Sequence, residues 1–116
     1  MNIMIEQYSF GNIVVSSVRY TNDMKIVQGK VVPEWWRQRG HSVDVDDIQD
    51  ILKSGPDIVV LGKGSPGMMK ATRALREFLK DQNIKLIEEK TAKAVETFNR
   101  LFKEDQNIAA GFHLTC

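Results

Sequence analysis

The sequence contains a single cysteine, Cys116, at the last of its 116 positions. One thiol cannot form an internal disulfide, so the sequence excludes a small disulfide-stapled scaffold and favours a reducing compartment. Long apolar runs are also missing, since no stretch approaches the ~18 residues of a membrane span. The N-terminal residues lack the charged and apolar regions of a signal peptide. We therefore expect a cytoplasmic protein with no membrane partner.

The sequence also lacks an excess of charge of either sign. Sixteen Lys and Arg residues face fifteen Asp and Glu residues, which leaves a formal net charge of +1. A nucleic-acid-binding protein needs a strong basic excess to neutralise phosphates, so nucleic acid is not an expected partner. A chain of 116 residues can bury a sufficient core without staples, and no linker or internal repeat divides it. We expect one domain over residues 1–116.

Histidine is scarce, and this argues against metal chemistry. The two histidines, His41 and His113, do not lie at metal-ligand spacing with each other or with Cys116. We therefore expect no metal site and no cofactor. A pair of Cys116 and His113 for nucleophilic catalysis remains a minor alternative, because a thiol at the chain end lacks a fixed partner that would lower its pKa. No Ser/His/Asp set is present at a recognisable spacing, so enzymatic activity is not expected.

The hydrophobic pattern predicts an α/β fold. Apolar and β-branched runs predict strands in residues 3–8, 13–15 and 24–27. A short helix capped by Asp44 or Asp46 follows, and Gly55-Pro56 ends it. Beyond it we expect a strand over 57–61, a helix over 68–80, a strand over 84–88, a helix capped by Thr91 and a closing strand over 108–115. This alternation predicts a largely parallel sheet covered by helices, with the N-terminal strands beside it.

A glycine-rich loop follows the most apolar strand. The stretch VVLGKGSPGMMKATRAL (59–75) contains glycines at 62, 64 and 67, which is the spacing of a dinucleotide-binding turn. Backbone N–H groups and a helix N-terminus would favour an anion at such a junction. The candidate ligand-binding residues are the loop residues and the start of the last helix as a second wall: Gly62, Lys63, Gly64, Ser65, Gly67 and Thr91.

Two observations oppose dinucleotide binding at this loop. Pro66 removes one N–H group from the cradle. The motif normally opens a six-stranded sheet, whereas only about fifty residues follow Gly67 here, so a pocket for the second nucleotide is missing. A tight strand-to-helix turn is the favoured interpretation. A cleft for a small anion is the next, and a dinucleotide site is the remaining alternative.

The segment Trp35-Trp36-Arg37 combines aromatic rings with a cation, a composition that is typical of partner surfaces. The favoured interpretation instead places one tryptophan in the core, the other against a loop and both arginines in solvent, since adjacent side chains usually face different ways. An exposed tryptophan would identify the segment as the contact patch.

Several of these pieces, in order, resemble the small MTH domain family. The resemblance covers nearly the whole chain and rests on YSFGNI (8–13), Tyr20, Asp23, Trp36-Arg37, Gly40-His41, PDIVVLGKG (56–64), Thr91, Ala94, Phe98-Asn99 and AAGFHLTC (109–116). It implies a three-layer α/β fold with a central mixed five-stranded sheet, helices and an extra N-terminal β layer. The family is not known for nucleotide-dependent enzymes. Its members include an adipogenesis-associated protein and, more distantly, a mitochondrial complex I assembly factor.

The resemblance and the residue patterns together predict a regulatory or assembly-type module without enzymatic activity. We expect it to bind an unknown protein partner or a small anionic ligand beside the loop Gly62–Gly67; a nucleotide-binding protein that uses the same turn is the alternative. An interaction module would expose Trp35 or Trp36. An anion site would instead show the N–H groups of Lys63 to Gly67 converging on one point.

Overall fold

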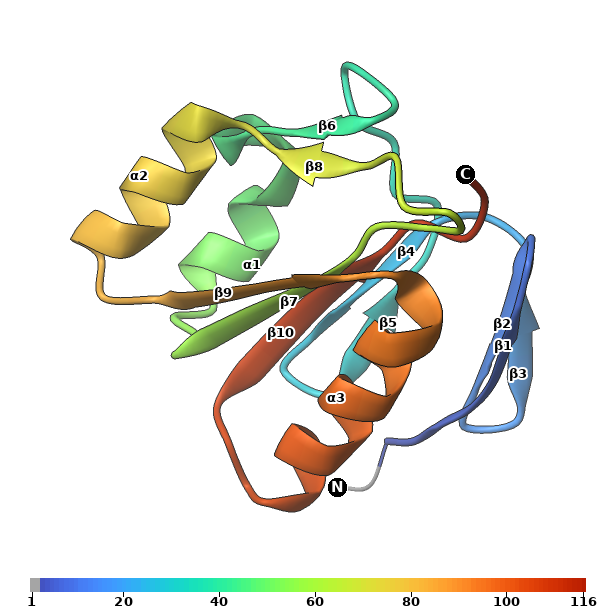
Figure 1. Cartoon of the computed structure of the whole chain (residues 1–116). Coiled ribbons are helices and arrows are strands. Elements are labelled where there is room, and N and C mark those ends of the chain that lie inside the picture. Colours follow the sequence, from blue (N-terminus) through green and yellow to red (C-terminus); the bar gives the residue numbers. More distant parts are fainter. Residues whose placement is uncertain (1–2) are drawn as a thin grey trace.

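The central layer is a five-stranded mixed sheet with the strand order β5-β4-β10-β7-β9 (Figure 1). It is seen in a computed structural model that describes residues 3–116. Its strands are β4 (Met24–Val27), β5 (Lys30–Val32), β7 (Ile58–Gly62), β9 (Lys85–Glu89) and β10 (Ile108–Phe112). Strands β10, β7 and β9 are parallel, whereas β4 and β5 join antiparallel. The mixed five-stranded sheet is confirmed, and the largely parallel arrangement holds only for the β10-β7-β9 half.

The two most apolar strands, β7 and β10, lie side by side in the middle of the sheet. Every residue of β10 is buried, and so is every residue of β7 after Ile58. Strands covered on both faces are expected to be continuously apolar, and the apolar run over 57–61 predicted such a strand. Their register pairs Phe112 with Gly62. The segments that follow these strands, the glycine loop and the chain end, therefore begin next to each other.

Two apolar cores lie on the two faces of this sheet. On one face, Val59 and Leu61 pack with residues of α1 (Gln49–Lys53) and α2 (Arg73–Asp81). On the other face, Val60 packs with Phe98 of α3 (Thr91–Lys103). The alternation of Val59, Val60 and Leu61 between the two cores follows the period of two along a strand. Consecutive β7 residues therefore bury their side chains on opposite faces of the sheet, which explains why Figure 1 shows helices on both of its sides.

An antiparallel N-terminal sheet completes the layer that contains α3. Its strands are β1 (Ile5–Ser9), β2 (Asn12–Val15) and β3 (Val18–Tyr20). The side chain of Asn99 in α3 accepts a hydrogen bond from the Ile5 N–H (3.0 Å) and donates one to the Ile5 carbonyl (2.8 Å). This amide joins the helix to the first strand, and the expected extra β layer is confirmed.

The prediction of a helix over 68–80 is wrong at its start, because α2 begins at Arg73. Residues Lys70–Ala71 form the short strand β8, which pairs with β6 (Ser42–Val43). Thr72 adopts an extended backbone, and its hydroxyl accepts the Leu75 N–H, as an N-cap does. The backbone bonds of β8 and this cap outweigh the helical periodicity of the preceding residues.

Two other element ends also differ from expectation. Lys90 rather than Thr91 is the N-cap of α3, and Thr91 is the first helical residue. Strand β10 ends at Phe112 instead of 115, because the following residues bond to other segments. By contrast, Asp44 caps the 3₁₀ turn η1 (Val45–Ile48) in a capping box with Asp47, as predicted for Asp44.

The Asn99 bridge can be tested by substitution. Asn99→Ala leaves the Ile5 N–H and carbonyl without their partners, and we expect it to lower the free energy of unfolding by about 1–3 kcal/mol. The exposed neighbour Arg100 supplies the matched control, Arg100→Ala, which should cost less than about 0.5 kcal/mol. Guanidinium denaturation measures both. Equal unfolding free energies for the two variants would contradict the bridge.

Candidate functional site

Three N–H groups of the glycine loop, those of Lys63, Gly64 and Ser65, are occupied within the protein. Lys63 donates to the Glu89 carbonyl (2.8 Å), and Ser65 donates to the Thr115 carbonyl (2.9 Å). Gly64 donates to the hydroxyl of Thr91 (2.8 Å). Pro66 has no N–H to give. These three groups therefore do not converge on an external anion, because the chain's own acceptors take them.

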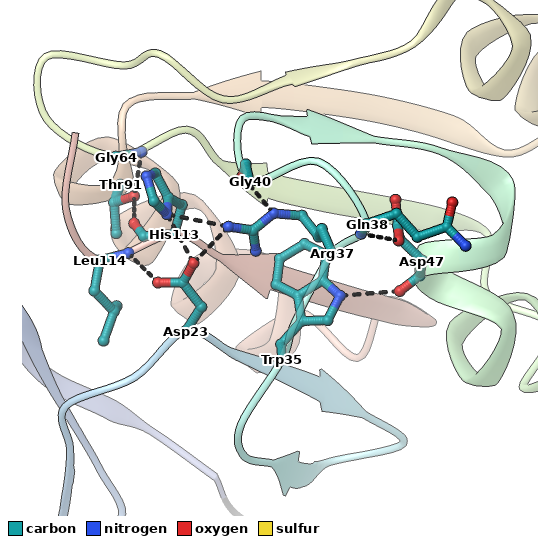
Figure 2. Close-up of polar contacts among 10 residues, drawn as sticks. All are labelled: Asp23, Trp35, Arg37, Gln38, Gly40, Asp47, Gly64, Thr91, His113 and Leu114. Carbon is teal, nitrogen blue, oxygen red and sulfur yellow. Dashed lines mark hydrogen bonds and ion pairs between the residues drawn. The ribbon is translucent and has the colours of Figure 1, made fainter.

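Thr91 lies beside the loop, as predicted, but it closes the junction rather than forming the wall of a cleft. Its buried hydroxyl accepts the Gly64 N–H and donates to the His113 carbonyl (2.6 Å) (Figure 2). Gly64 has a positive φ of 95°, and a Cβ there would overlap the Thr115 carbonyl oxygen. The glycine at this position is explained by close packing against the chain end.

The adjacent feature is a buried charge cluster formed by Asp23, Arg37 and His113 (Figure 2). One Asp23 oxygen, Oδ2, accepts from Arg37 Nη2 and from His113 Nδ1, each at 2.7 Å. The other oxygen accepts the Leu114 N–H at 2.8 Å. The contact of Nδ1 with a carboxylate requires a hydrogen on that nitrogen, which assigns the donor role to Nδ1. Three segments that are distant in sequence thus meet at one carboxylate.

The surroundings favour the ionised form of Asp23. Burial alone would raise its pKa, but hydrogen bonds from His113, Arg37 and the Leu114 amide outweigh burial and hold the pKa below its ordinary value. Tyr8 lies close by and donates its hydroxyl to the Leu114 carbonyl (2.9 Å). Its burial and the negative charge of Asp23 raise the pKa of Tyr8. The cluster therefore keeps one fixed negative charge beside the Arg37 guanidinium and the His113 ring.

Two polar atoms of the cluster have no hydrogen-bond partner within residues 3–116: Arg37 Nη1 and His113 Nε2. Both side chains are well buried, at 5% and 7% exposure. They line a pocket of about 250 Å³ together with His41, Trp36 and neighbouring residues, and we name it the histidine pocket. Unpaired polar atoms in a buried wall are unusual in folded proteins, so this pocket is a candidate for ligand binding.

The cluster presents an oriented imidazole without a nucleophile bonded to it. Asp23 holds Nδ1 of His113, an arrangement that leaves Nε2 available for proton transfer in enzymes. No hydroxyl or thiol in the described part of the chain bonds to Nε2, and the Cys116 thiol is exposed. The geometry supports binding at this pocket more directly than catalysis.

Of the three residues predicted to form a partner surface, Trp36 alone is exposed (74%). Trp35 is 4% exposed; its ring lies against Gly111 of β10, where a Cβ would be 2.7 Å from the ring. Arg37 is buried, with its guanidinium 4.5 Å from the centre of the Trp35 ring. The interpretation with one tryptophan in the core is confirmed for Trp35, but its placement of Arg37 in solvent is wrong, because Asp23 and the Gly40 carbonyl hold that side chain inside.

A second hollow, of about 440 Å³, lies on the other side of Trp36. We name it the acidic hollow, since its lining includes Glu34, Asp46 and Asp47. Its single lysine, Lys25, is paired with Asp50 at 2.8 Å. Asp47 accepts the backbone N–H groups of Gln38 and Asp44, so the negative charge open to a partner comes from the exposed residues Glu34 and Asp46.

A larger hollow of about 700 Å³ lies between Ile3–Met4 and the end of α3. Its charged lining residues, Arg100, Lys103 and Asp105, are all exposed. Residues 3–116 contain no group of three or more side chains suited to bind a metal ion. Within the same range, no helix has the length and apolar character needed to cross a membrane.

Reasoning from the sequence missed the pairing of Asp23 with His113, which are 90 positions apart. No local spacing connects the two residues. Asp23, in a turn, and His113, in the closing segment, both belong to the residues on which the family resemblance rests. The resemblance assigned no role to either residue. The one indication in the sequence that Asp23 and His113 act together was therefore that both belong to the family pattern.

A sequence model of the family DUF498/DUF598, described as proteins of unknown function, matches residues 5–113. Solved structures show the same fold at low identity. A conserved hypothetical protein from Pyrococcus horikoshii is 22% identical, with 100% of each chain covered and a TM-score of 0.82. A protein from Bartonella henselae, named as an outer membrane protein, is 21% identical over 97% of this chain and 94% of its own (TM-score 0.83). A Mth938-like domain from Bordetella pertussis is 18% identical over 96% and 85% (TM-score 0.64).

The lowered pKa of Asp23 predicts a specific loss of stability in acid. Because the folded protein binds this proton less readily than the unfolded chain, Asp23 stabilises the fold above its unfolded pKa of about 3.9. That stabilisation is lost as the pH falls through the lower folded value. Asp23→Asn should therefore be less stable than wild type by about 3 kcal/mol at pH 5, and the difference should shrink toward pH 2.

Denaturation of both proteins across this pH range measures the difference, with the exposed Asp46→Asn as control. A gap between wild type and Asp23→Asn that stays constant down to pH 2 would contradict the assignment.

Proposed function

The chain belongs to the DUF498/DUF598 family of proteins of unknown function, and from that premise we propose that it is a protein-interaction module whose contact surface is centred on Trp36. The observation that carries this proposal is the 74% exposure of Trp36 on a segment that is otherwise held in place. Tryptophan is enriched among the residues that dominate binding energy at interfaces. A soluble fold gains nothing from leaving its largest apolar side chain in water.

The segment around Trp36 is fixed on both sides. The Trp35 N–H donates to the Asp23 carbonyl (2.8 Å), and the indole N–H donates to the Asp47 carbonyl (2.9 Å). Arg37 is held by Asp23 and by the Gly40 carbonyl (2.7 Å). With both neighbours directed inward, the side chain of Trp36 projects outward. A contact residue that is already held in its bound orientation loses little entropy on association.

Two further exposed apolar side chains belong to loops bonded to the same chain end. Phe10 precedes Gly11, whose N–H donates to the Leu114 carbonyl, and the Met68 N–H donates to the Cys116 carbonyl. Phe10 and Met68 are both more than half exposed. Exposed apolar residues that gather near one part of a surface support an interaction site there.

The charges beside Trp36 suggest the chemistry of the partner. The acidic hollow presents Glu34 and Asp46, and its one lysine is already neutralised by Asp50. We propose that the partner is an extended protein segment that covers Trp36 with an apolar residue and places a lysine or arginine side chain in this hollow. The aliphatic stem of such a side chain would pack on Val32 and Pro33, which line the same hollow.

The hydrogen bonds of the glycine loop also bear on this proposal. Lys63, Gly64 and Ser65 spend their N–H groups on acceptors within the protein, which supports an interaction surface over nucleotide binding at the loop. The second candidate function, binding of a small anion, is favoured by the histidine pocket instead of the loop.

Selection of peptides from a random displayed library tests this proposal without knowledge of the natural partner. Selected peptides should contain a lysine or arginine near an apolar residue, and their binding should shift the fluorescence of Trp36 to shorter wavelength. Trp36→Ala should weaken their binding by about 30-fold, since a central tryptophan contributes about 2 kcal/mol or more. Asp46→Lys should also weaken it through charge repulsion.

The matched control is Phe78→Ala, which removes an exposed aromatic ring from α2. It should leave peptide binding unchanged. Peptides that bind Trp36→Ala as tightly as wild type, or a library that yields no binding peptide, would contradict the proposal.

A further inference from the structure

The central sheet ends in an open edge at β9, at the opposite end of the strand order from β5 (Figure 1). We propose that this edge pairs antiparallel with β9 of a second copy of the chain, so that the two central sheets join into one. The inference does not rest on the proposed peptide partner, because no residue of β9 lines the hollows beside Trp36.

The first argument is the direction of the backbone groups of β9. Lys85 donates its N–H to the carbonyl of the residue that precedes β7 (2.9 Å), and the Glu89 carbonyl accepts the N–H of the residue that follows β7 (2.8 Å). Both residues thus direct their backbone groups toward β7. Because successive residues of a strand direct these groups to alternate sides, Leu86 and Glu88 direct theirs to the free edge. The edge therefore presents the N–H and C=O groups that a further strand requires.

The second argument is that β9 lacks most of the devices that blunt a sheet edge. It has five residues without proline, in regular register with β7, whereas β5 at the other edge has three. Two of its three charged side chains are tied to the faces of the sheet. Glu88 accepts the Ala71 N–H (2.9 Å), and Glu89 accepts the Thr97 hydroxyl (2.6 Å). The third, Lys85, is exposed. A long and regular edge of this kind is a template for another strand.

The charges of β9 identify the occupant, because its sequence KLIEE is complementary to itself when two copies run antiparallel. With the two-fold axis at Ile87, Leu86 lies opposite Glu88 of the second copy, and this pair exchanges both of its backbone hydrogen bonds. Lys85 then lies opposite Glu89 of the second copy, and the symmetry repeats this pair. Opposite charges directly across an antiparallel pair stabilise it.

The neighbouring registers lack this match. An axis at Glu88 would place the Glu88 side chains of the two copies opposite each other, which is unfavourable for like charges. An axis at Leu86 would place Lys85 opposite Ile87. The charges therefore select the axis at Ile87, and a second copy is the strand that carries the matching charges.

Sedimentation equilibrium of the wild-type chain, over a concentration series up to about 1 mM, measures the association. The mean mass should rise from that of the monomer toward twice that value. Lys85→Glu should raise the dissociation constant of the dimer by about tenfold or more, because both symmetric pairs then join like charges. Glu89→Lys should do the same. An equimolar mixture of the two variants should approach the wild-type dissociation constant, because each copy then faces opposite charges.

Lys30→Glu, an exposed lysine on the other edge strand β5, is the matched control and should dimerise as wild type does. Amide exchange of the wild-type chain adds a readout without substitution, since the Leu86 and Glu88 amides should gain protection as the dimer fraction rises.

A wild-type chain that stays monomeric throughout the series would overturn the proposal. A dimer whose dissociation constant is the same for Lys85→Glu would also overturn it, even if Glu89→Lys does not fold. A monomer whose Leu86 and Glu88 amides are protected only by a selected peptide would assign the edge to a strand of another protein, and would overturn the second copy as the occupant.

Discussion

The carboxylate of Asp23 is the interaction on which this end of the molecule depends. It accepts hydrogen bonds from Arg37, His113 and the Leu114 amide, so one side chain joins the turn before β4, the segment after β5 and the residues after β10. Each partner offsets part of the cost of burying the charge, and removal of the carboxylate would leave buried cations without a counter-ion. The sheet already pairs Met24 with Phe112, and the bonds of Asp23 attach the segment of Arg37 to this junction.

The same cluster explains both candidate sites. Arg37 is directed inward by Asp23, and Trp35 is directed inward by the core, which forces the intervening Trp36 outward. Arg37 Nη1 and His113 Nε2, on the sides of these groups away from Asp23, have no hydrogen-bond partner within residues 3–116. The Trp36 surface and the histidine pocket are thus two consequences of one buried carboxylate.

Local signals in the sequence predicted much of the fold but little of the site. The apolar run of β7, the capping residue Asp44 and the periodicity of α3 each depend on neighbouring residues, and the structure contains all three. The site depends on pairs such as Asp23 with His113, which no local spacing connects. The glycine spacing predicted a tight strand-to-helix turn, whereas the chain passes through β8 before α2 begins. The spacing also could not reveal that Thr91 and the chain end would take the N–H groups of Gly64 and Ser65. Long-range acceptors decide whether a glycine loop is open, and a motif contains no information about them.

Amide hydrogen exchange of wild type and Asp23→Asn at neutral pH tests the central claim most directly. The account predicts faster exchange at Leu114, whose amide bonds the carboxylate, and at the Trp35 and Gln38 amides, because the segment around Trp36 loses one of its attachments, while the amides of α2 keep their protection. Unchanged exchange across residues 35–41 in a folded Asp23→Asn protein would show that the Asp23 carboxylate does not hold this segment.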